Sequence, residues 1–453
     1  MRPAPLPLLL ALIWAWPQEP VGPPPGPSEL LAEIGLRFSP QALADLLAAS
    51  PRPSLPPSPG NPWADDLDAA RLGQRLFFDP GLSWGGSTNC ASCHPPNRLF
   101  TNGVMDLRGP EALRRQSPTL VDAAYLPWLG WTGSSDSLWS QALGPLEDVT
   151  EHDGNRVAFV HHLAEDPTLS GAYTGVFGPL PSAEERALWP REAKPVPSRP
   201  NHRLERAWQG MDAAQQQAAS RVLANIGKAI EAYERRLLSG PAPFDAFVAG
   251  LSRGDRAARD QFGLAAARGA WVFFERARCQ RCHSGPLFSD GDFHDNRAPV
   301  LEPERDDPGR ALGLAKLAAS PFNAWGPFGD PRLPAPQLPA AESQRGLWRT
   351  APLRNLARGL HPRGPTAQLG GRDRALLELG AGSAGRSDPA RGGRTPPPER
   401  RRARRSGAVP ALAAGPAAAR GLAPAAAVRA VRRGTGREVI DRRCARAATP
   451  PVG

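Results

Sequence analysis

Two short stretches of the chain combine thiol and imidazole side chains at the same spacing. Residues 90–94 read Cys-Ala-Ser-Cys-His, and residues 279–283 read Cys-Gln-Arg-Cys-His. In a Cys-x-x-Cys-His stretch the two thiols can add to the two vinyl groups of a haem, and the adjacent histidine can ligate the iron. The sequence therefore predicts two covalently attached c-type haems. The predicted attachment residues are Cys90, Cys93, His94, Cys279, Cys282 and His283.

Cysteine pairs also occur in zinc ribbons and in redox dithiols, so both alternatives apply here. In a four-cysteine zinc ribbon the two pairs are separated by some tens of residues at most. In this chain the pairs lie much farther apart, and each is followed directly by histidine. The spacing therefore favours haem over zinc or a dithiol. The fifth cysteine, Cys444, has no assigned role.

The elements that hold these motifs are expected to be mainly helical. The clearest helix covers residues 213–240, where apolar residues such as Val222, Ile226 and Ile230 recur at steps of three and four. Gly240 followed by proline predicts its end. Shorter helices are expected over residues 28–50 and 262–278, and strands are hard to find. The predicted fold class is mainly α, with short helices and long loops around each haem.

These features suggest an organisation with two haem domains. Its expected parts are a signal peptide (1–18), a proline-rich leader to the first domain (19–61), an N-terminal haem domain (62–212), a linking helix (213–240), a C-terminal haem domain (241–358) and an aberrant tail (359–453).

The first residues favour export. Arg2 precedes an apolar run over residues 6–16, which is typical of a secretory signal peptide and too short to span a bilayer as a helix. No other segment is apolar for long enough to cross a membrane. The periplasm is the expected location, with no stable membrane span.

The basic charge of the chain lies in its tail. Residues 359–453 contain 19 arginines, no lysine and six acidic residues, whereas the whole chain has a net charge of +11. The rest of the chain is therefore close to neutral. A nucleic-acid partner, which a high isoelectric point would otherwise suggest, is not expected. Arginine, alanine, glycine and proline dominate the tail, which is typical of a disordered segment.

Several further segments around the two motifs resemble one family in the same order. Arg-Leu-Phe-Phe-Asp-Pro-Gly-Leu-Ser precedes the first motif, and Ala-Pro-Leu-Arg-Asn follows the second. Residues 72–358 resemble the bacterial di-haem cytochrome c peroxidase and MauG family in this order of motifs. The segments 137–141 and 321–324 are most similar to its MauG-like, MbnH-like branch. The other segments that carry the resemblance are 117–120, 131–133, 141–146, 226–234 and 284–286.

The resemblance implies a fold of two cytochrome-c-like domains and roles for specific residues. The haem of the N-terminal domain would react with hydrogen peroxide, with His94 as its proximal ligand. Glu151 matches a distal glutamate that can shuttle the peroxide proton, and Gln141 matches a distal glutamine. Trp131 matches a tryptophan that lies between the two haems and relays oxidising equivalents.

The activity that the resemblance implies is peroxide-dependent oxidation of a protein partner. In MbnH-like enzymes that partner is a copper-binding protein, and a tryptophan side chain is oxidised. Two alternatives stay open. The first is a cytochrome c peroxidase that reduces peroxide with electrons from a small cytochrome or copper protein. The second is a di-haem electron carrier without enzymatic activity.

The sequence departs from the family at two functional positions. Gln116 stands where relatives often have an asparagine that helps to bind calcium, which argues against an interdomain calcium ion here. The second haem of the family also needs a downstream Met or Tyr as sixth ligand, yet all three Met and all three Tyr precede Cys279. We hypothesise a shifted reading frame near Arg358, because codons read one base later can restore a Tyr-x-His-x-Gly stretch and a tyrosine at the position of Leu376.

Overall fold

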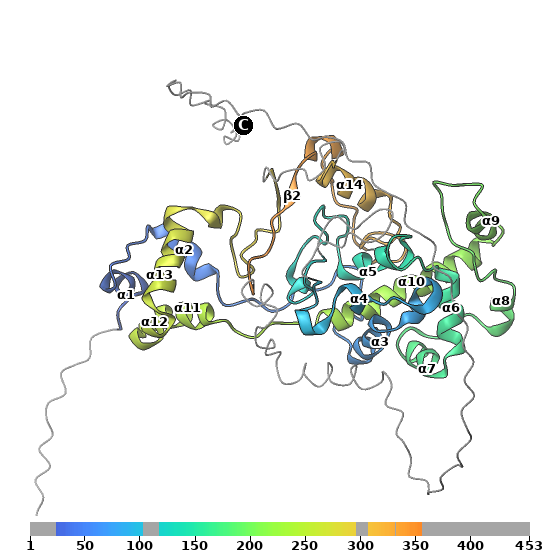
Figure 1. The fold of residues 1–453 in the computed structure, drawn as a ribbon, viewed down its shortest axis with the longest axis horizontal. Helices are drawn as coiled ribbons and strands as arrows, with labels where there is room; N and C mark the ends of the chain where they lie inside the picture. Colours follow the sequence, from blue (N-terminus) through green and yellow to red (C-terminus); the bar gives the residue numbers. More distant parts are fainter. Residues whose placement is uncertain (1–23, 103–116, 296–306, 331, 356–453) are drawn as a thin grey trace, which may run out of the picture. The chain divides into compact units, whose positions relative to one another are not determined.

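The computed structural model describes residues 24–102, 117–295, 307–330 and 332–355 (Figure 1). The expectations for the signal peptide, for Gln116 and for the tail with Cys444 fall outside these residues. All the described residues belong to one compact unit, Met1–Ser387. They are mainly helical, which confirms the predicted fold class.

Helices account for most of the regular structure. The first half of the chain contributes α1 (Pro27–Glu33), α2 (Pro40–Ala48), α3 (Leu67–Phe77), α4 (Cys90–Cys93), α5 (Leu138–Glu147), α6 (Arg156–Glu165), α7 (Pro167–Phe177) and α8 (Ala183–Ala187). The chain continues with α9 (Arg203–Gln209), α10 (Ala213–Glu234), α11 (Pro243–Arg253), α12 (Arg256–Phe262), α13 (Leu264–Trp271) and α14 (Arg310–Ala319).

One small sheet accompanies these helices. It pairs β1 (Phe293–His294) with β2 (Trp348–Arg349) in antiparallel register, and Phe293 lies opposite Arg349. Among the described helices, none is long and apolar enough to cross a membrane.

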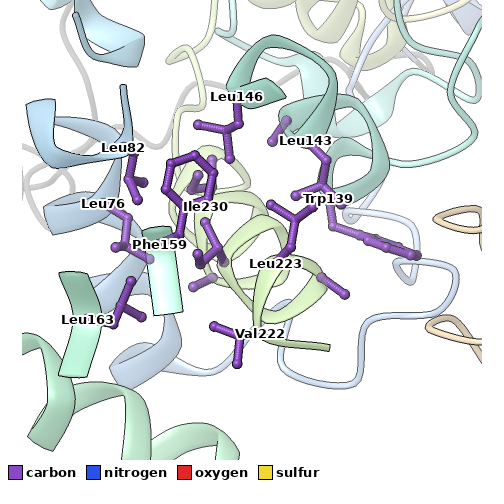
Figure 2. Close-up of a cluster of buried hydrophobic side chains, with 14 of the residues drawn as sticks. Leu76, Leu82, Trp139, Leu143, Leu146, Phe159, Leu163, Val222, Leu223 and Ile230 are labelled. Carbon is purple, nitrogen blue, oxygen red and sulfur yellow. The ribbon is translucent and has the colours of Figure 1, made fainter. Parts of the chain in front are cut away.

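Helix α10 forms the centre of the larger core. The side chain of Asp212 accepts from the backbone N–H of Gln215, and the side chain of Gln215 accepts from the N–H of Asp212, so a capping box starts the helix. The helix then packs Val222, Leu223 and Ile230 against α3, α5 and α6, as Figure 2 shows. It ends at Glu234, six residues before the stop that the sequence suggests.

Close backbone approach decides how α3 packs on α10. A Cβ atom on Gly73 would lie 1.7 Å from the carbonyl oxygen of Ala229, so only glycine lets the two helices come this close. Leu72, Leu76 and Phe77 then bury their side chains in the same core.

A second core lies around α11 and α13. Phe247 and Phe274 pack there with Leu30 and Leu46 from α1 and α2. This corrects one expectation from the sequence, because residues 28–50 form two helices rather than one. The two helices pack with elements close to the second motif. The chain turns between the two helices at Gly35, whose φ is +78°. The second helix starts at Pro40, where a proline at the first position suits a helix start.

Candidate haem sites

The first motif lies on a single helical turn that its own flanking residues hold in place. The side chain of Asn89 accepts from the backbone N–H of Ser92 and so caps α4 at Cys90. Its amide nitrogen also donates to the carbonyl of Phe78 over 3.0 Å, which ties the turn to the end of α3. Cys90 and Cys93 are both half-buried.

The imidazole of His94 is oriented by a backbone carbonyl. Its Nδ1 lies 2.8 Å from the carbonyl oxygen of Phe100. A carbonyl only accepts, so Nδ1 carries the proton and donates it, which leaves Nε2 as the nitrogen able to ligate iron. Phe100 points its carbonyl this way from a left-handed backbone, with φ of 55°.

The second motif repeats this arrangement. Cys279 begins a short 3-10 turn after Arg278, which has a φ of 56°. The Nδ1 of His283 lies 3.0 Å from the carbonyl oxygen of Phe288, whose φ is 54°. The same chemistry therefore sets the imidazole tautomer at both motifs.

Sequence reasoning missed the two acceptor residues, Phe100 and Phe288. A signal was present: residues 99–102 read Leu-Phe-Thr-Asn and residues 287–290 read Leu-Phe-Ser-Asp, at nearly the same distance after each motif. The donor set therefore fits a covalent haem at each motif, with two thiols and one histidine whose Nε2 is available. A histidine that ligates a metal usually donates its other N–H in this way.

Buried acidic groups surround the first motif. Glu234 is 4% exposed, its Oε2 has no partner among the described residues, and burial raises its pKa to about 8. Burial also raises the pKa of the Cys90 thiol, and the carboxyls of Glu234 and Glu151 raise it further. Glu234 and Glu151 therefore both lie within electrostatic range of the first motif.

Glu151 lies in the turn that follows α5. Its side chain is half-buried, and its backbone N–H donates to the carbonyl of Asp148 over 3.1 Å. Burial raises the pKa of Glu151 to about 7, the charge of Asp148 raises it further and the charge of Lys316 lowers it. A carboxyl with this pKa can take up and release a proton near neutral pH.

The other two site residues of the sequence analysis are also half-buried. Gln141 lies in the first turn and a half of α5, and its backbone N–H donates to the carbonyl of Ser137. Trp131 lies in a loop between Gly130 and Gly133, and its carbonyl accepts from the backbone N–H of Arg349 over 3.1 Å.

Comparison with known proteins shows which family the chain resembles. The model of the di-haem cytochrome c peroxidase family matches residues 68–253. MauG of Methylorubrum extorquens is 31% identical over 260 residues, which cover 57% of this chain and 60% of that protein. The cytochrome c peroxidase IdrP1 of Denitromonas iodatirespirans is 32% identical over 262 residues, 57% of each chain. Over residues 68–253 the chain is therefore similar to the di-haem cytochrome c peroxidase family.

Coverage of the relatives is partial. The chain spans about 60% of the length of the MauG relative and 57% of the IdrP1 relative. The residues matched by the family model include the first motif and end before the second. Among solved structures, the di-haem peroxidase BthA from Burkholderia thailandensis aligns with a TM-score of 0.46 at 22% identity, over 69% of this chain and 71% of that one.

A di-haem family implies two c-type haems, and the cysteines are arranged accordingly. Within the described residues the four motif cysteines do not gather into one group of metal-binding side chains. The group that does form combines Cys282, Asp290 and His294, with ligand atoms within 4.8 Å of one another. There the Nε2 of His294 lies 2.7 Å from Asp290. The four-cysteine zinc ribbon considered from the sequence therefore has no support in this part of the chain.

Proposed function

We propose that this chain is a peroxide-dependent di-haem oxidoreductase whose first motif carries the peroxide-reacting haem. The observation that carries the proposal is the placement of Glu151. It is half-buried, its pKa is raised to about 7, and its charge acts on Cys90 of the first motif. A proton shuttle with a pKa near the working pH is what heterolytic peroxide chemistry needs.

The residues of the first motif would have separate tasks. A c-type haem attached here supplies redox-active iron that can react with hydrogen peroxide. His94 would hold the iron through Nε2, while its Nδ1–H donates to Phe100 and raises the basicity of the ligand. Glu151 would accept the proton of the incoming peroxide and return it to the departing oxygen. Gln141 would donate a hydrogen bond that orients the peroxide.

The residues of the second motif would hold the electron-transfer haem. His283 would ligate its iron through Nε2, with Nδ1–H donating to Phe288. Trp131 would relay oxidising equivalents, because an indole loses an electron readily. The sixth ligand and the calcium site of the family depend on residues outside the described part of the chain.

For the substrate we propose a protein partner, in the manner of MauG-like enzymes. The support is the match with MauG at 31% identity and the resemblance of segments 137–141 and 321–324 to the MbnH-like branch. A copper-binding protein with an oxidisable tryptophan is the partner class that this branch suggests. Export to the periplasm through residues 1–18 belongs to the same proposal.

A second candidate function is reduction of peroxide by a small electron-donor protein. The match with the cytochrome c peroxidase IdrP1 favours it, since its 32% identity is as high as the 31% identity with MauG. The two functions share the chemistry at Glu151 and differ only in where the two electrons come from. A ferrous or cuprous donor protein consumed in a ratio of two per peroxide would identify the peroxidase.

The test is peroxide reactivity in a haem-loaded protein with Glu151→Gln. We would coexpress the chain with a c-haem maturation system, count covalent haems by pyridine haemochrome and follow the spectrum after mixing with peroxide. The expected result is two haems in both forms and a rate that falls by about 10²–10⁴-fold in the variant. Glu184→Gln, which removes an exposed carboxylate on α8, is the matched control and should react at the wild-type rate.

Two results would contradict the proposal. If Glu151→Gln with full haem content reacts as fast as the wild type, Glu151 is not the proton shuttle. If the ferric protein shows no high-spin band, both irons have six ligands, and the non-enzymatic electron carrier is the correct reading.

A further inference from the structure

Two arginines hold the loop that carries Trp131. Arg349 donates from Nε to the carbonyl of Gly130 over 3.1 Å, and its backbone N–H donates to the carbonyl of Trp131 over 3.1 Å. Nη1 of Arg310 donates over 3.0 Å to Thr132 and also to the next carbonyl. Four consecutive carbonyls, residues 130–133, therefore accept hydrogen bonds from these two residues.

Both guanidinium groups are buried and charged. Arg310 is 3% exposed and Arg349 is 4% exposed. The guanidinium of Arg310 lies between two aromatic rings, 4.6 Å from the centroid of Trp128 and 3.9 Å from that of Phe293. Burial lowers the pKa of each arginine to about 10, so both are cations at neutral pH.

These two arginines lack the partner that other buried arginines have. Among the described residues, each of the other buried arginines has an acidic partner: the ion pairs are Arg156–Glu147, Arg235–Asp65, Arg259–Glu33, Arg259–Asp260 and Arg354–Asp245. In the same part of the chain, no carboxylate forms an ion pair with Arg310 or Arg349. Asp292 acts on Arg310 only through its charge. An unpaired buried cation is costly, so a bound anion would stabilise this place.

The two guanidinium groups also have donor nitrogens without an acceptor among the described residues. Nε and Nη2 of Arg310 and Nη2 of Arg349 have no acceptor within the described residues, although guanidinium forks suit carboxylates well. The place is tied to the second motif. Arg349 pairs with Phe293 across the two-stranded sheet, and the hydroxyl of Ser289 donates to the carbonyl of Thr350 over 2.8 Å.

We propose that Arg310 and Arg349 bind the propionate carboxylates of the haem attached at residues 279–283. The haem brings the anionic charge that the two guanidinium groups lack. Their hydrogen bonds to residues 130–133 then couple the position of Trp131 to that haem. The inference rests on the cofactor of the proposed function and does not depend on the peroxide reaction.

The test is the midpoint potential of each haem in the full haem-loaded chain, measured by spectroelectrochemical titration. Arg310→Gln and Arg349→Gln keep a side-chain donor for the loop carbonyls and remove the positive charge. Loss of a cation beside the propionates favours the ferric state, so the potential of one haem should shift downward while the other changes little. Arg310→Lys and Arg349→Lys keep the charge and should restore most of the potential.

Arg221→Gln is the matched control. Its guanidinium also stacks on an aromatic ring, 4.8 Å from the centroid of Phe328, and donates to the carbonyl of Pro327, but the residue is exposed. Its replacement should leave both potentials unchanged.

Unchanged potentials in both glutamine variants would overturn the proposal. A loss of thermal stability without a shift in potential would also overturn it, because it would mean that a carboxylate of the chain itself neutralises the arginines. If the Arg310→Gln protein cannot be produced in folded form, the midpoint potentials of Arg349→Gln alone decide the test. A wild-type chain without covalent haem would sink both this inference and the proposed function. A haem-loaded chain that does not react with peroxide would contradict only the proposed function.

Discussion

The proton-shuttle role of Glu151 predicts how the peroxide reaction depends on pH. Because burial holds the pKa of this carboxyl at about 7, the group is protonated in weak acid and ionised in weak base. Only the carboxylate can accept the peroxide proton. The second-order rate constant should therefore rise through neutrality and reach a plateau in weak base.

The size of the effect follows from the pKa. With a pKa of about 7, roughly 9% of the protein carries the carboxylate at pH 6 and roughly 91% at pH 8. The rate constant should thus increase about tenfold over this interval. Glu151→Gln, which has no group to ionise, should show a flat and low profile over the same range.

Two charged neighbours of Glu151 allow the direction of its pKa shift to be tested. The charge of Asp148 raises the pKa of Glu151, so Asp148→Asn should move the midpoint of the profile to lower pH. The charge of Lys316 lowers that pKa, so Lys316→Gln should move the midpoint to higher pH. Each shift should be a few tenths of a pH unit, because an exposed charge contributes about 0.5 kcal/mol and one unit corresponds to about 1.4 kcal/mol.

Stopped-flow mixing with peroxide at constant ionic strength measures all four profiles. The haem Soret band gives the rate constant, and pyridine haemochrome confirms equal haem content at each pH. Shifts of the same sign in Asp148→Asn and Lys316→Gln would refute the assignment of the titrating group to Glu151. A tenfold rise that persists in Glu151→Gln would refute it as well.

Three further predictions concern stability and haem attachment. Arg354→Met leaves the half-buried carboxylate of Asp245 without its ion-pair partner and should cost about 1.5–3 kcal/mol in chemical denaturation. Gly73→Ala places a Cβ atom 1.7 Å from the carbonyl oxygen of Ala229 and should cost about 1–3 kcal/mol; an unchanged melting temperature would show that α3 and α10 do not pack this closely. Asn89→Ala removes the cap of α4, at about 1 kcal/mol, and should lower haem occupancy at the first motif, read by mass spectrometry of its tryptic peptide.

The local features of the chain could be predicted from its sequence. The two Cys-x-x-Cys-His motifs gave the candidate sites directly, because attachment depends on residues close together in the chain. The apolar period of residues 213–240 gave α10 for the same reason. Its end was placed too late. The chain leaves the helix after Glu234, and Ser239 then donates its backbone N–H to the carboxylate of Asp122.

Features that depend on distant residues or on the backbone could not be predicted. Nothing local shows that Leu30 and Leu46 pack on Phe247, more than 200 residues later, because any apolar partner would satisfy the same pattern. The carbonyls of Phe100 and Phe288 orient the two histidines through left-handed backbone conformations, which side-chain chemistry does not encode for phenylalanine. The raised pKa of Glu151 likewise arises from burial in the folded chain.

Three of the buried polar atoms without a partner in the described residues lie close to the motifs. Most buried polar atoms in a folded protein have a partner, and each one without a partner costs about 1–3 kcal/mol. Within the described residues, the Tyr233 hydroxyl and Glu234 Oε2 lie without partners within electrostatic range of Cys90, and Gln280 Oε1 lies without one inside the second motif. The unpaired charges of Arg310 and Arg349 lie on the segment tied to that second motif. Haems attached at the two motifs would account for these groups. They do not account for the unpaired atoms elsewhere in the described residues, such as His161 Nε2 and Trp189 Nε1.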